Sequence, residues 1–461
     1  MHSIFFMLKD FMILKKRDSI IPNFLQFSPY IFFFITYIFL YVYSLYTKNI
    51  SISISTALES IPLLAAFLAT IYAFYTFKES IKIDKKIEIF LSGIATTKVI
   101  HCYFAIVYLI IFNYMMAKIN GTLVAITLGL LYIPATVIFP IIFFIAALVS
   151  IIIANVQASI IILLPIGYGI AMSLHGDSAL MAATIISGAL CGNHAWLYFN
   201  NITLDDTNFN LKKWLHQLEP SVIPIFIATT STIFILSQYP CQSISANILC
   251  HLQNSLQFYD YVTIIPYIFL LLSRFFAINF VISIVIASGI ALIIEIILHK
   301  IMFFDAIVTI FNGFYAEPIV QNLLLLHFFI AGLTKIMQYN GGFDWIVKKL
   351  EEKREQGSLN MNTTAIIMTI LTNLFVIIDT SFADYSAKTF TTADNISKNT
   401  IKLFSDITAT ICQTMIPYGS IMFLAIYINK SSYLTIIKYM IYPIIAMMIT
   451  LSIVLHDNVY L

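Results

Sequence analysis

A carboxylate precedes a run of hydroxyl side chains in an otherwise apolar segment late in the sequence. Asp406 is followed by Thr408, Thr410 and then Pro417. Carboxylate and hydroxyl oxygens are the ligands that hard cations prefer. Burial disfavours the charged form of a carboxyl group, so a buried Asp406 could hold a proton and release it to a competing cation. We therefore predict a sodium site at Asp406, with ligands from the hydroxyls and from the backbone that Pro417 frees.

Amide and imidazole groups are concentrated in a second segment, 187–201, which lies between long apolar stretches. Gly188 and Gly192 are expected to loosen a helix there. Burying so many polar groups without partners would be costly, so we predict a cavity or ion site. The residues expected to bind the ion or solute are Asn193, His194, Asn200 and Asn201.

Three acidic residues of the second half could carry a coupled proton, because ionisable groups placed among apolar segments often mark transport pathways. They are Glu317, Asp379 and Asp384, and Asp406 is a fourth candidate. Four other carboxylates are expected at helix ends, where they would cap the helix or reach water: Glu59, Asp177, Glu295 and Asp305.

The composition decides which elements must position these residues. Of the 461 residues, 60% are apolar and 10% are charged, whereas soluble domains carry roughly 25% charged residues. Long unbroken apolar runs require helices in a bilayer, because backbone groups in hydrocarbon must be bonded within their own segment. Uncharged stretches of membrane-crossing length predict an all-α polytopic membrane protein with about 11–13 transmembrane or re-entrant helices.

Proline and glycine interrupt several of these stretches. Broken helices at matching positions of two halves are the best sequence signal for a binding site near the membrane midplane. We predict two inverted repeats with broken helices, 29–237 and 260–461, with a cytoplasmic segment 1–28 before them and an external loop 238–259 between them. The interruptions are expected at Pro134 and Pro140; Pro165, Gly167 and Gly169; Gly188 and Gly192; Gly313 and Pro318; and Pro417 and Gly419.

Lysine and arginine clusters set the expected orientation, because short cytoplasmic loops carry an excess of these residues. One threading makes the clusters at 15–17, 78–86, 212–213 and 348–354 cytoplasmic, together with the N-terminus. The loop 238–259 holds no lysine or arginine and is then external.

Several classes of function find no support in the sequence. It contains no G-x-x-x-x-G-K-[ST] loop, no G-x-G-x-x-G and no H-E-x-x-H, so we expect no nucleotide, no cofactor and no enzymatic activity. A net charge of +2 without a basic face argues against nucleic acid as a partner. The expected partners are Na+ and H+ or a small organic solute, together with the lipid bilayer. A homodimer is left open.

Both polar segments resemble motifs of the NhaC-type Na+/H+ antiporter family. Residues 395–419 are similar to the family's L-S-r-t-l-E-D-x-g-T followed by I-P-W, and Tyr418 stands where the tryptophan is usual. Residues 187–201 are similar to the family's G-D-x-x-S-P-x-S-D-T-T. The residues that match the two motifs are Gly192 and His194 in the first, and Ser397, Asp406, Thr410, Ile416 and Pro417 in the second.

Residues 187–201 depart from the family's motif at several positions. Asn193 and Asn200 stand where the family has aspartates, and the loop before the motif appears here as ANVQAS, 154–159. An asparagine can ligate Na+ through its carbonyl oxygen but cannot carry a proton, so proton coupling would have moved or been lost. Four other motif positions also differ: Trp196, Leu197, Asn201 and Ile202.

The resemblance implies a secondary active transporter of a bacterial inner (plasma) membrane that exchanges Na+ for H+ by alternating access. The alternative is an exchanger of an organic anion or amino acid on the same scaffold, because neutral asparagines beside His194 and helix N-termini would suit an anionic group. A third interpretation is a degenerate membrane protein that transports nothing.

Overall fold

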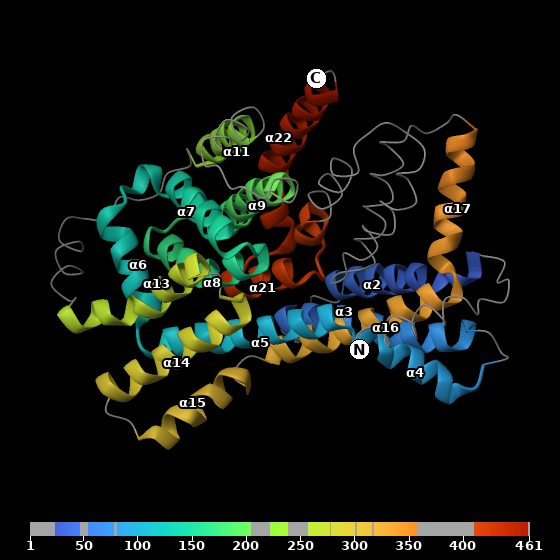
Figure 1. The fold of residues 1–461 in the computed structure, drawn as a ribbon, viewed down its shortest axis with the longest axis horizontal. Helices are drawn as coiled ribbons and strands as arrows, with labels where there is room; N and C mark the ends of the chain where they lie inside the picture. The colour runs from blue at the N-terminus through green and yellow to red at the C-terminus, as the bar shows by residue number, and fades with distance from the viewer. Residues whose placement is uncertain are drawn as a thin grey trace. The chain divides into compact units, whose positions relative to one another are not determined.

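The computed structural model describes residues 24–46, 54–77, 81–203, 222–237, 257–276, 278–299, 302–315, 318–356 and 410–459. Every regular element within these ranges is a helix, which confirms the all-α prediction (Figure 1). The 3-10 helices are η1 (Phe24–Gln26), η2 (Ala135–Val137), η3 (Phe258–Ile264) and η4 (Ser273–Phe276). The α-helices are α2 (Ser28–Tyr46), α3 (Ile54–Thr76), α4 (Ile83–Ile94), α5 (Thr97–Lys118), α6 (Gly121–Tyr132), α7 (Ile138–Ile153), α8 (Val156–Ser173), α9 (Ser178–Thr203), α11 (Val222–Leu236), α13 (Ile265–Leu272), α14 (Phe280–His299), α15 (Phe303–Tyr315), α16 (Pro318–Asn340), α17 (Gly342–Glu355), α21 (Ser420–Asn429) and α22 (Tyr433–Val459).

Helices of the described part are long and apolar enough to cross a membrane. Such helices bond their backbone groups internally, so the chain is a polytopic α-helical membrane protein. Residues 1–23 and 238–256 lie outside the described ranges, and the predicted sidedness and external loop stay predictions. The six candidate spans are Val99–Lys118, Ala135–Ile153, Val156–Ser173, Phe280–Leu298, Thr410–Asn429 and Tyr433–Thr450.

The chain divides into two compact units, and each unit draws on both halves of the sequence. Unit 1 contains residues 1–99 and 325–368, and unit 2 contains residues 100–324 and 369–461. The predicted repeat boundaries follow the sequence instead, and they stay a prediction.

Unit 1 is held together by small and aromatic side chains. The face of α3 that carries Ala69 and Ala73 is fully buried, and α2 packs against α3. The hydroxyl of Tyr30 on α2 is hydrogen-bonded to that of Thr334 on α16. Trp345 of α17 stacks on Phe27, with ring centroids 6.0 Å apart.

One lysine of the basic cluster at 78–86 points into unit 1. Nζ of Lys86 donates to the carbonyl oxygens of Phe74, at 3.1 Å, and Phe77, at 3.4 Å. These carbonyls lie at the C-terminal end of α3, where backbone acceptors have no partner within the helix. The partial negative charge of that end also favours a cation. Lys86 therefore caps α3, while the neighbouring Lys85 is exposed.

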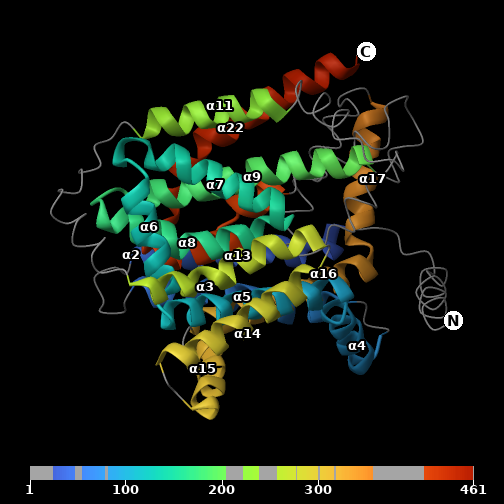
Figure 2. The ribbon, with the colours of Figure 1, turned by 60° about the vertical axis from the view of Figure 1, so that its left-hand side comes forward.

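Unit 2 is built around α9, which packs against α7, α8, α11 and α22 (Figures 1 and 2). A Cβ atom added at Gly188 would lie 2.4 Å from the carbonyl oxygen of Phe143, and one at Gly192 would lie 2.1 Å from that of Ala147. The prediction that these glycines loosen the helix is wrong, because α9 runs without interruption. Small residues four apart let two helix backbones meet in a membrane.

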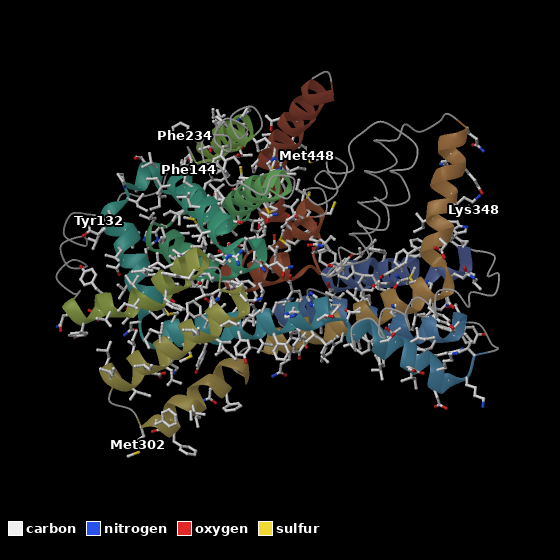
Figure 3. All side chains as sticks on the ribbon, in the orientation of Figure 1. Tyr132, Phe144, Phe234, Met302, Lys348 and Met448 are labelled. Carbon is white, nitrogen blue, oxygen red and sulfur yellow. The ribbon has the colours of Figure 1, made fainter. Side chains whose placement is uncertain are left out.

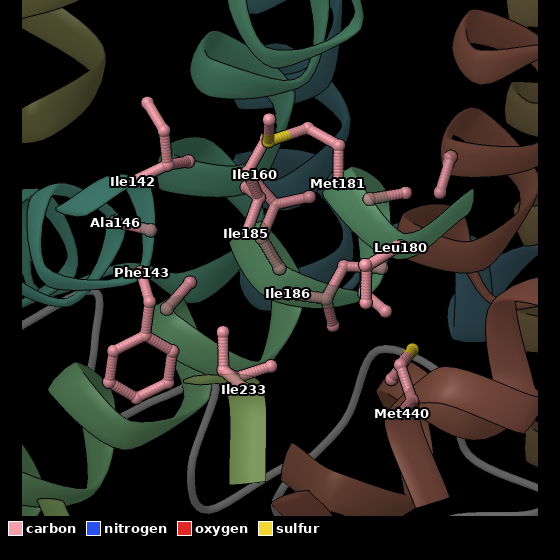
Figure 4. Packing of buried hydrophobic residues seen from close by; sticks show 14 of the residues in the cluster. Ile142, Phe143, Ala146, Ile160, Leu180, Met181, Ile185, Ile186, Ile233 and Met440 are labelled. Carbon is pink, nitrogen blue, oxygen red and sulfur yellow. The ribbon is translucent and has the colours of Figure 1, made fainter. Parts of the chain in front are cut away.

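Apolar side chains fill the space around this contact (Figure 4). Farther along α7, Phe144 stacks on Phe226 of α11 with ring centroids 5.7 Å apart, and Figure 3 marks Phe144. The side chains of the central cluster include Ile142 and Phe143 of α7, Ile160 of α8, Leu180, Met181, Ile185 and Ile186 of α9, Ile233 of α11 and Met440 of α22.

The predicted interruption at Pro417 and Gly419 is confirmed, because the helix at 410–415 ends there and α21 starts at Ser420. Pro134 also separates two elements, α6 and η2. The prediction is wrong at Pro165, which lies inside the continuous helix α8. Membrane helices tolerate a proline where neighbouring groups satisfy the freed carbonyl.

The other prolines and glycines of the predicted interruptions lie at helix ends or serve packing. Pro140 lies in the first turn of α7 and Pro318 begins α16, positions where a missing N–H does no harm. Gly313 lies within α15. Gly167 and Gly169 of α8 make room for the side chains of Ile185 and Ile126, respectively.

Three consecutive helices recur in the chain with a constant spacing. The start residues of α5 and α16 are 221 positions apart (97 to 318), as are those of α6 and α17 (121 to 342). The amphipathic helices before them, α4 and α15, start 220 positions apart (83 to 303). A duplicated half would give such a spacing, and the predicted repeats stay a prediction.

A pair of glycine contacts follows the same spacing. In unit 1, a Cβ at Gly93 of α4 would lie 2.6 Å from the Cβ of Lys335 on α16. In unit 2, a Cβ at Gly313 of α15 would lie 3.0 Å from the ring of Tyr114 on α5. Each amphipathic helix thus makes a glycine contact with a long helix, α4 with α16 and α15 with α5.

We predict that Gly192→Ala destabilises the protein by about 1–3 kcal/mol, because its Cβ would overlap the α7 backbone. The measurement is the thermal unfolding midpoint of the detergent-solubilised chain. Gly289→Ala is the matched control, since no atom lies within 4 Å of a Cβ at that position of α14. Equal midpoints for the two variants would refute the close contact between α7 and α9.

We also expect Lys86→Met to lower the unfolding midpoint, because two carbonyls at the end of α3 lose a charged donor worth roughly 1.5–3 kcal/mol. Lys85→Met, on the exposed side of the same helix, should leave the midpoint unchanged. A smaller loss for Lys86→Met than for Lys85→Met would contradict the capping role.

Candidate functional site

The predicted site residues divide into those on described elements and those outside them. Asn193 and His194 lie on α9 and are buried, at 8% and 2% exposure. Thr410 lies in the helix before the interruption, and Pro417 lies within the interruption. The side chains of Asn200 and Asn201 are outside the described set, and so are the residues Thr408, Asp406, Asp379, Asp384 and Glu317. The sodium site at Asp406 and the proton-coupling carboxylates therefore stay predictions.

Four polar side chains form one face of α9, here called the α9 polar face: Thr184, Ser187, Cys191 and His194. Residues three and four apart share a side of a helix, and all four of these residues are buried. Sγ of Cys191 lies 3.6 Å from Oγ1 of Thr229, so this face is turned toward α11. Thr184 is satisfied within the helix, since its hydroxyl donates to the carbonyl of Leu180.

Ser187 and His194 complete the α9 polar face. Within the described residues, no hydrogen bond reaches the hydroxyl of Ser187 or either ring nitrogen of His194. A buried polar group without a partner costs about 1–3 kcal/mol, and apolar side chains of α11 and α22 pack around this helix. Such groups are retained where a ligand or water completes them, so this face is a candidate binding surface.

The interruption at Pro417 and Gly419 leaves backbone donors in the protein interior. Gly419 is the N-cap of α21 and has no side chain to offer the first turn. The N–H groups of Ser420, Ile421 and Met422 make no hydrogen bond in the described part, and all three residues are buried. The first intrahelical bond runs from Phe423 N to Gly419 O. A helix N-terminus with free donors carries partial positive charge and favours anions.

Hydrogen bonds fix the start of α9 against the end of α21. The hydroxyl of Ser178 donates to the Asn429 carbonyl at 3.3 Å and pairs with that of Ser431 at 2.9 Å. Asp177 accepts from the Ala179 N–H at 2.8 Å, which confirms the prediction that it caps a helix. Its other oxygen accepts from the Tyr439 hydroxyl at 2.7 Å.

The bonds of Ser178 join only one end of each helix. Both helices contribute side chains to one apolar core, and α21 packs mainly against α8.

The ANVQAS segment forms a tight turn between α7 and α8. Ala154 ends α7 with a positive φ of 56°, and Asn155 starts the next helix. The side-chain oxygen of Asn155 accepts from the Ala158 N–H at 3.0 Å, so this asparagine is an N-cap. It fixes where α8 begins.

The prediction that Glu295 reaches water at a helix end is wrong. It is only 6% exposed and lies within the candidate span Phe280–Leu298. Ile284, Ser288 and Ala291 precede it at intervals of three and four residues and are buried as well, so Glu295 belongs to the inward stripe of α14. That stripe was readable from the spacing, but which side of an apolar helix faces protein depends on its neighbours.

Two other acidic residues were predicted at helix ends. Asp305 lies in the first turn of α15 and is exposed, as predicted. The side chain of Glu59 on α3 is outside the described set. Among the described residues, no three His, Cys, Asp or Glu side chains gather as a metal site would require.

Comparisons with known proteins add a loose structural similarity. No family model and no curated protein match the sequence. Among solved structures, the crystal structure of the Alcanivorax borkumensis YdaH transporter, described as having an unusual topology, aligns with a TM-score of 0.43 and 11% identity. The alignment covers 85% of this chain and 95% of that one. At this score the likeness carries no functional argument, and membership of the NhaC family stays a prediction.

We predict that cysteines placed on the α9 polar face react with a small, charged, water-soluble thiol reagent. In a variant lacking the five native cysteines, Ser187→Cys and His194→Cys should be modified in membranes, because a solute site must admit water. Ile186→Cys, on the packed side of the same helix, should stay unmodified. Equal protection of all three positions would argue against an accessible site on this face.

Proposed function

We propose that the chain is a secondary active transporter whose solute site lies in unit 2 and draws on the α9 polar face and the N-terminus of α21. The chain spans the membrane many times, and its sequence offers no motif for using a nucleotide. An ion or solute gradient is then the available energy source. Interrupted helices that present free backbone groups at membrane depth are typical of secondary transporters.

The balance of hydrogen-bonding groups favours a small organic anion, such as a carboxylate or an amino acid. Within the described residues, the backbone N–H groups of the buried residues Ser420, Ile421 and Met422 have no hydrogen-bond partner, and this is the observation that carries the proposal. Ser187 and His194 can each donate one more hydrogen bond. A carboxylate accepts several such bonds at once, and the dipole of α21 adds to its attraction.

Exchange of Na+ for H+ is the second candidate function. It is supported by the interruption at Pro417 and Gly419, which follows Asp406 and its hydroxyl residues in the sequence. In this version, oxygens freed near the interruption would hold the cation. Asp406, Asp379, Asp384 and Glu317 are the candidates for the proton, and Asn193 could contribute its carbonyl oxygen.

Alternating access would require the segments around the site to move against the rest of unit 2. The turn at Ala154 and Asn155 and the interruption at 416–419 are the natural hinges, because regular helical hydrogen bonding stops at both. Rocking of packed repeats around such interruptions exposes a fixed site to each side in turn.

A single backbone donor can be removed to test the anion site. Ser420 is the first residue of α21, a position that accepts proline, and Gly419 already has the extended backbone that a following proline requires (φ −69°, ψ 146°). Ser420→Pro deletes one N–H, while Ser420→Ala keeps it and removes only the hydroxyl. With purified protein in liposomes and a panel of labelled carboxylates and amino acids, we expect Ser420→Pro to raise the KM roughly tenfold or more.

Ser420→Ala should transport like the unaltered chain. Equal KM values for the two variants, both folded as judged by their unfolding midpoints, would remove the α21 N-terminus from the site. Absence of flux with every solute tested, from folded protein, would instead support a protein that does not transport.

The cation alternative has its own test in everted membrane vesicles. Antiport predicts that Na+ or Li+ collapses a pre-formed pH gradient and that Asp406→Asn abolishes the collapse while Asp305→Asn, on the exposed face of α15, does not. A gradient that survives Na+ and Li+ at every pH would eliminate this version and leave anion exchange standing.

A further inference from the structure

Two short helices, α4 and α15, are unlike the spans that follow them. They contain 12 and 13 residues, which is about 18 and 20 Å of helix, whereas the hydrocarbon core is about 30 Å thick. Neither is among the candidate spans or the shorter apolar helices of the described part. Their place in the membrane must therefore differ from that of α5 and α16.

The surface of α15 has three sectors. Gly313 faces the protein and packs on Tyr114. Phe304, Val308 and Phe311, spaced four and three residues apart, form an exposed apolar stripe, with Phe304 77% and Phe311 61% exposed. Beside this stripe run two exposed polar residues seven apart, Asp305 and Asn312. Met302, at the start of the helix, is also exposed and is labelled in Figure 3.

The surface of α4 has the same three sectors in the same order around the helix. Gly93 faces the protein and packs on Ala331 and Lys335 of α16. The exposed apolar stripe contains residues 83, 87 and 91, which are isoleucine, isoleucine and leucine. The adjacent exposed polar sector contains residues 84, 85 and 88, which are aspartate, lysine and glutamate.

Neither water nor hydrocarbon alone suits such a helix. A spanning helix would carry its charged sector into hydrocarbon, and a helix in water would expose large aromatic and aliphatic side chains. The boundary between headgroups and acyl chains accommodates both sectors. α15 also packs on α14, whose Ile293 and Ile297 are exposed within a candidate span, so the stripe belongs to a helix that adjoins an expected lipid-facing surface.

We propose that α4 and α15 lie in the plane of the membrane interface and that the phospholipid headgroup–acyl boundary is the partner of their apolar stripes. Each helix would be held on its third side by the glycine contact with a long helix, so the bilayer surface sets the depth of α16 through α4 and of α5 through α15. The equivalent three-sector pattern in two helices that start 220 positions apart makes an accidental apolar stripe a poor explanation. This inference does not depend on the transported solute.

The depth of nitroxide labels in liposomes tests the proposal. In the cysteine-free variant, single cysteines at Phe304, Phe311 and Asn312 of α15 are labelled, and Ile293→Cys on α14 serves as the reference for hydrocarbon. Collision with O2, which is enriched in hydrocarbon, is compared with collision with a water-soluble nickel chelate. We expect labels at Phe304 and Phe311 at a depth of about 5–10 Å, the label at Ile293 deeper, and the label at Asn312 accessible to the chelate.

The same experiment on α4 uses Ile87→Cys and Leu91→Cys for the stripe and Glu88→Cys for the polar sector. Stripe labels as deep as the Ile293 reference would mean that these helices insert into the core and would overturn the proposal. Stripe labels that collide only with the chelate would place them in water and would also overturn it. Dipolar broadening between labels of two molecules would identify a second copy of the chain as the occupant in place of lipid.

Discussion

Hydrocarbon cannot satisfy a polar group, and this constraint governs the structure. Because of it, most of the backbone N–H and C=O groups of the described helices form hydrogen bonds within their own helix. Side-chain hydroxyls such as those of Thr184, Thr229 and Thr450 donate to carbonyls one turn back. Against that background, groups without partners among the described residues are conspicuous, and they include Ser187 and His194 of α9 and the first N–H groups of α21.

Glycines have two structural roles in this chain. Gly419 has an extended backbone and is the N-cap of α21 after the proline interruption. Because it has no side chain, it offers no acceptor to the N–H groups that follow. At Gly188 and Gly192 it removes side chains so that α7 and α9 touch through their backbones. The first kind leaves backbone donors without an intrahelical partner, and the second brings two helices into close contact. A site at membrane depth requires both, because free donors are useful only if the surrounding helices keep lipid out.

A constant spacing relates the helices α4, α5 and α6 to the helices α15, α16 and α17. Gly93 and Gly313 each seat a short amphipathic helix on a long one, at positions that correspond under the same shift. The two predicted site segments do not share a common form: α9 is a continuous helix that carries His194, and the later segment is interrupted at Pro417.

Local chemistry determined part of this protein from sequence alone. Helical membrane spans follow from composition, the interruption at Pro417 follows from a missing N–H, and the cap at Asp177 follows from a carboxylate at a helix start, because each effect acts within a few residues. The continuity of α9 through Gly188 and Gly192, the burial of Glu295, and the bonds between the start of α9 and the end of α21 were decided only by the tertiary structure. A glycine loosens a helix or tightens a contact, and an acidic residue meets water or protein, according to which neighbour packs there, and that neighbour is distant in sequence.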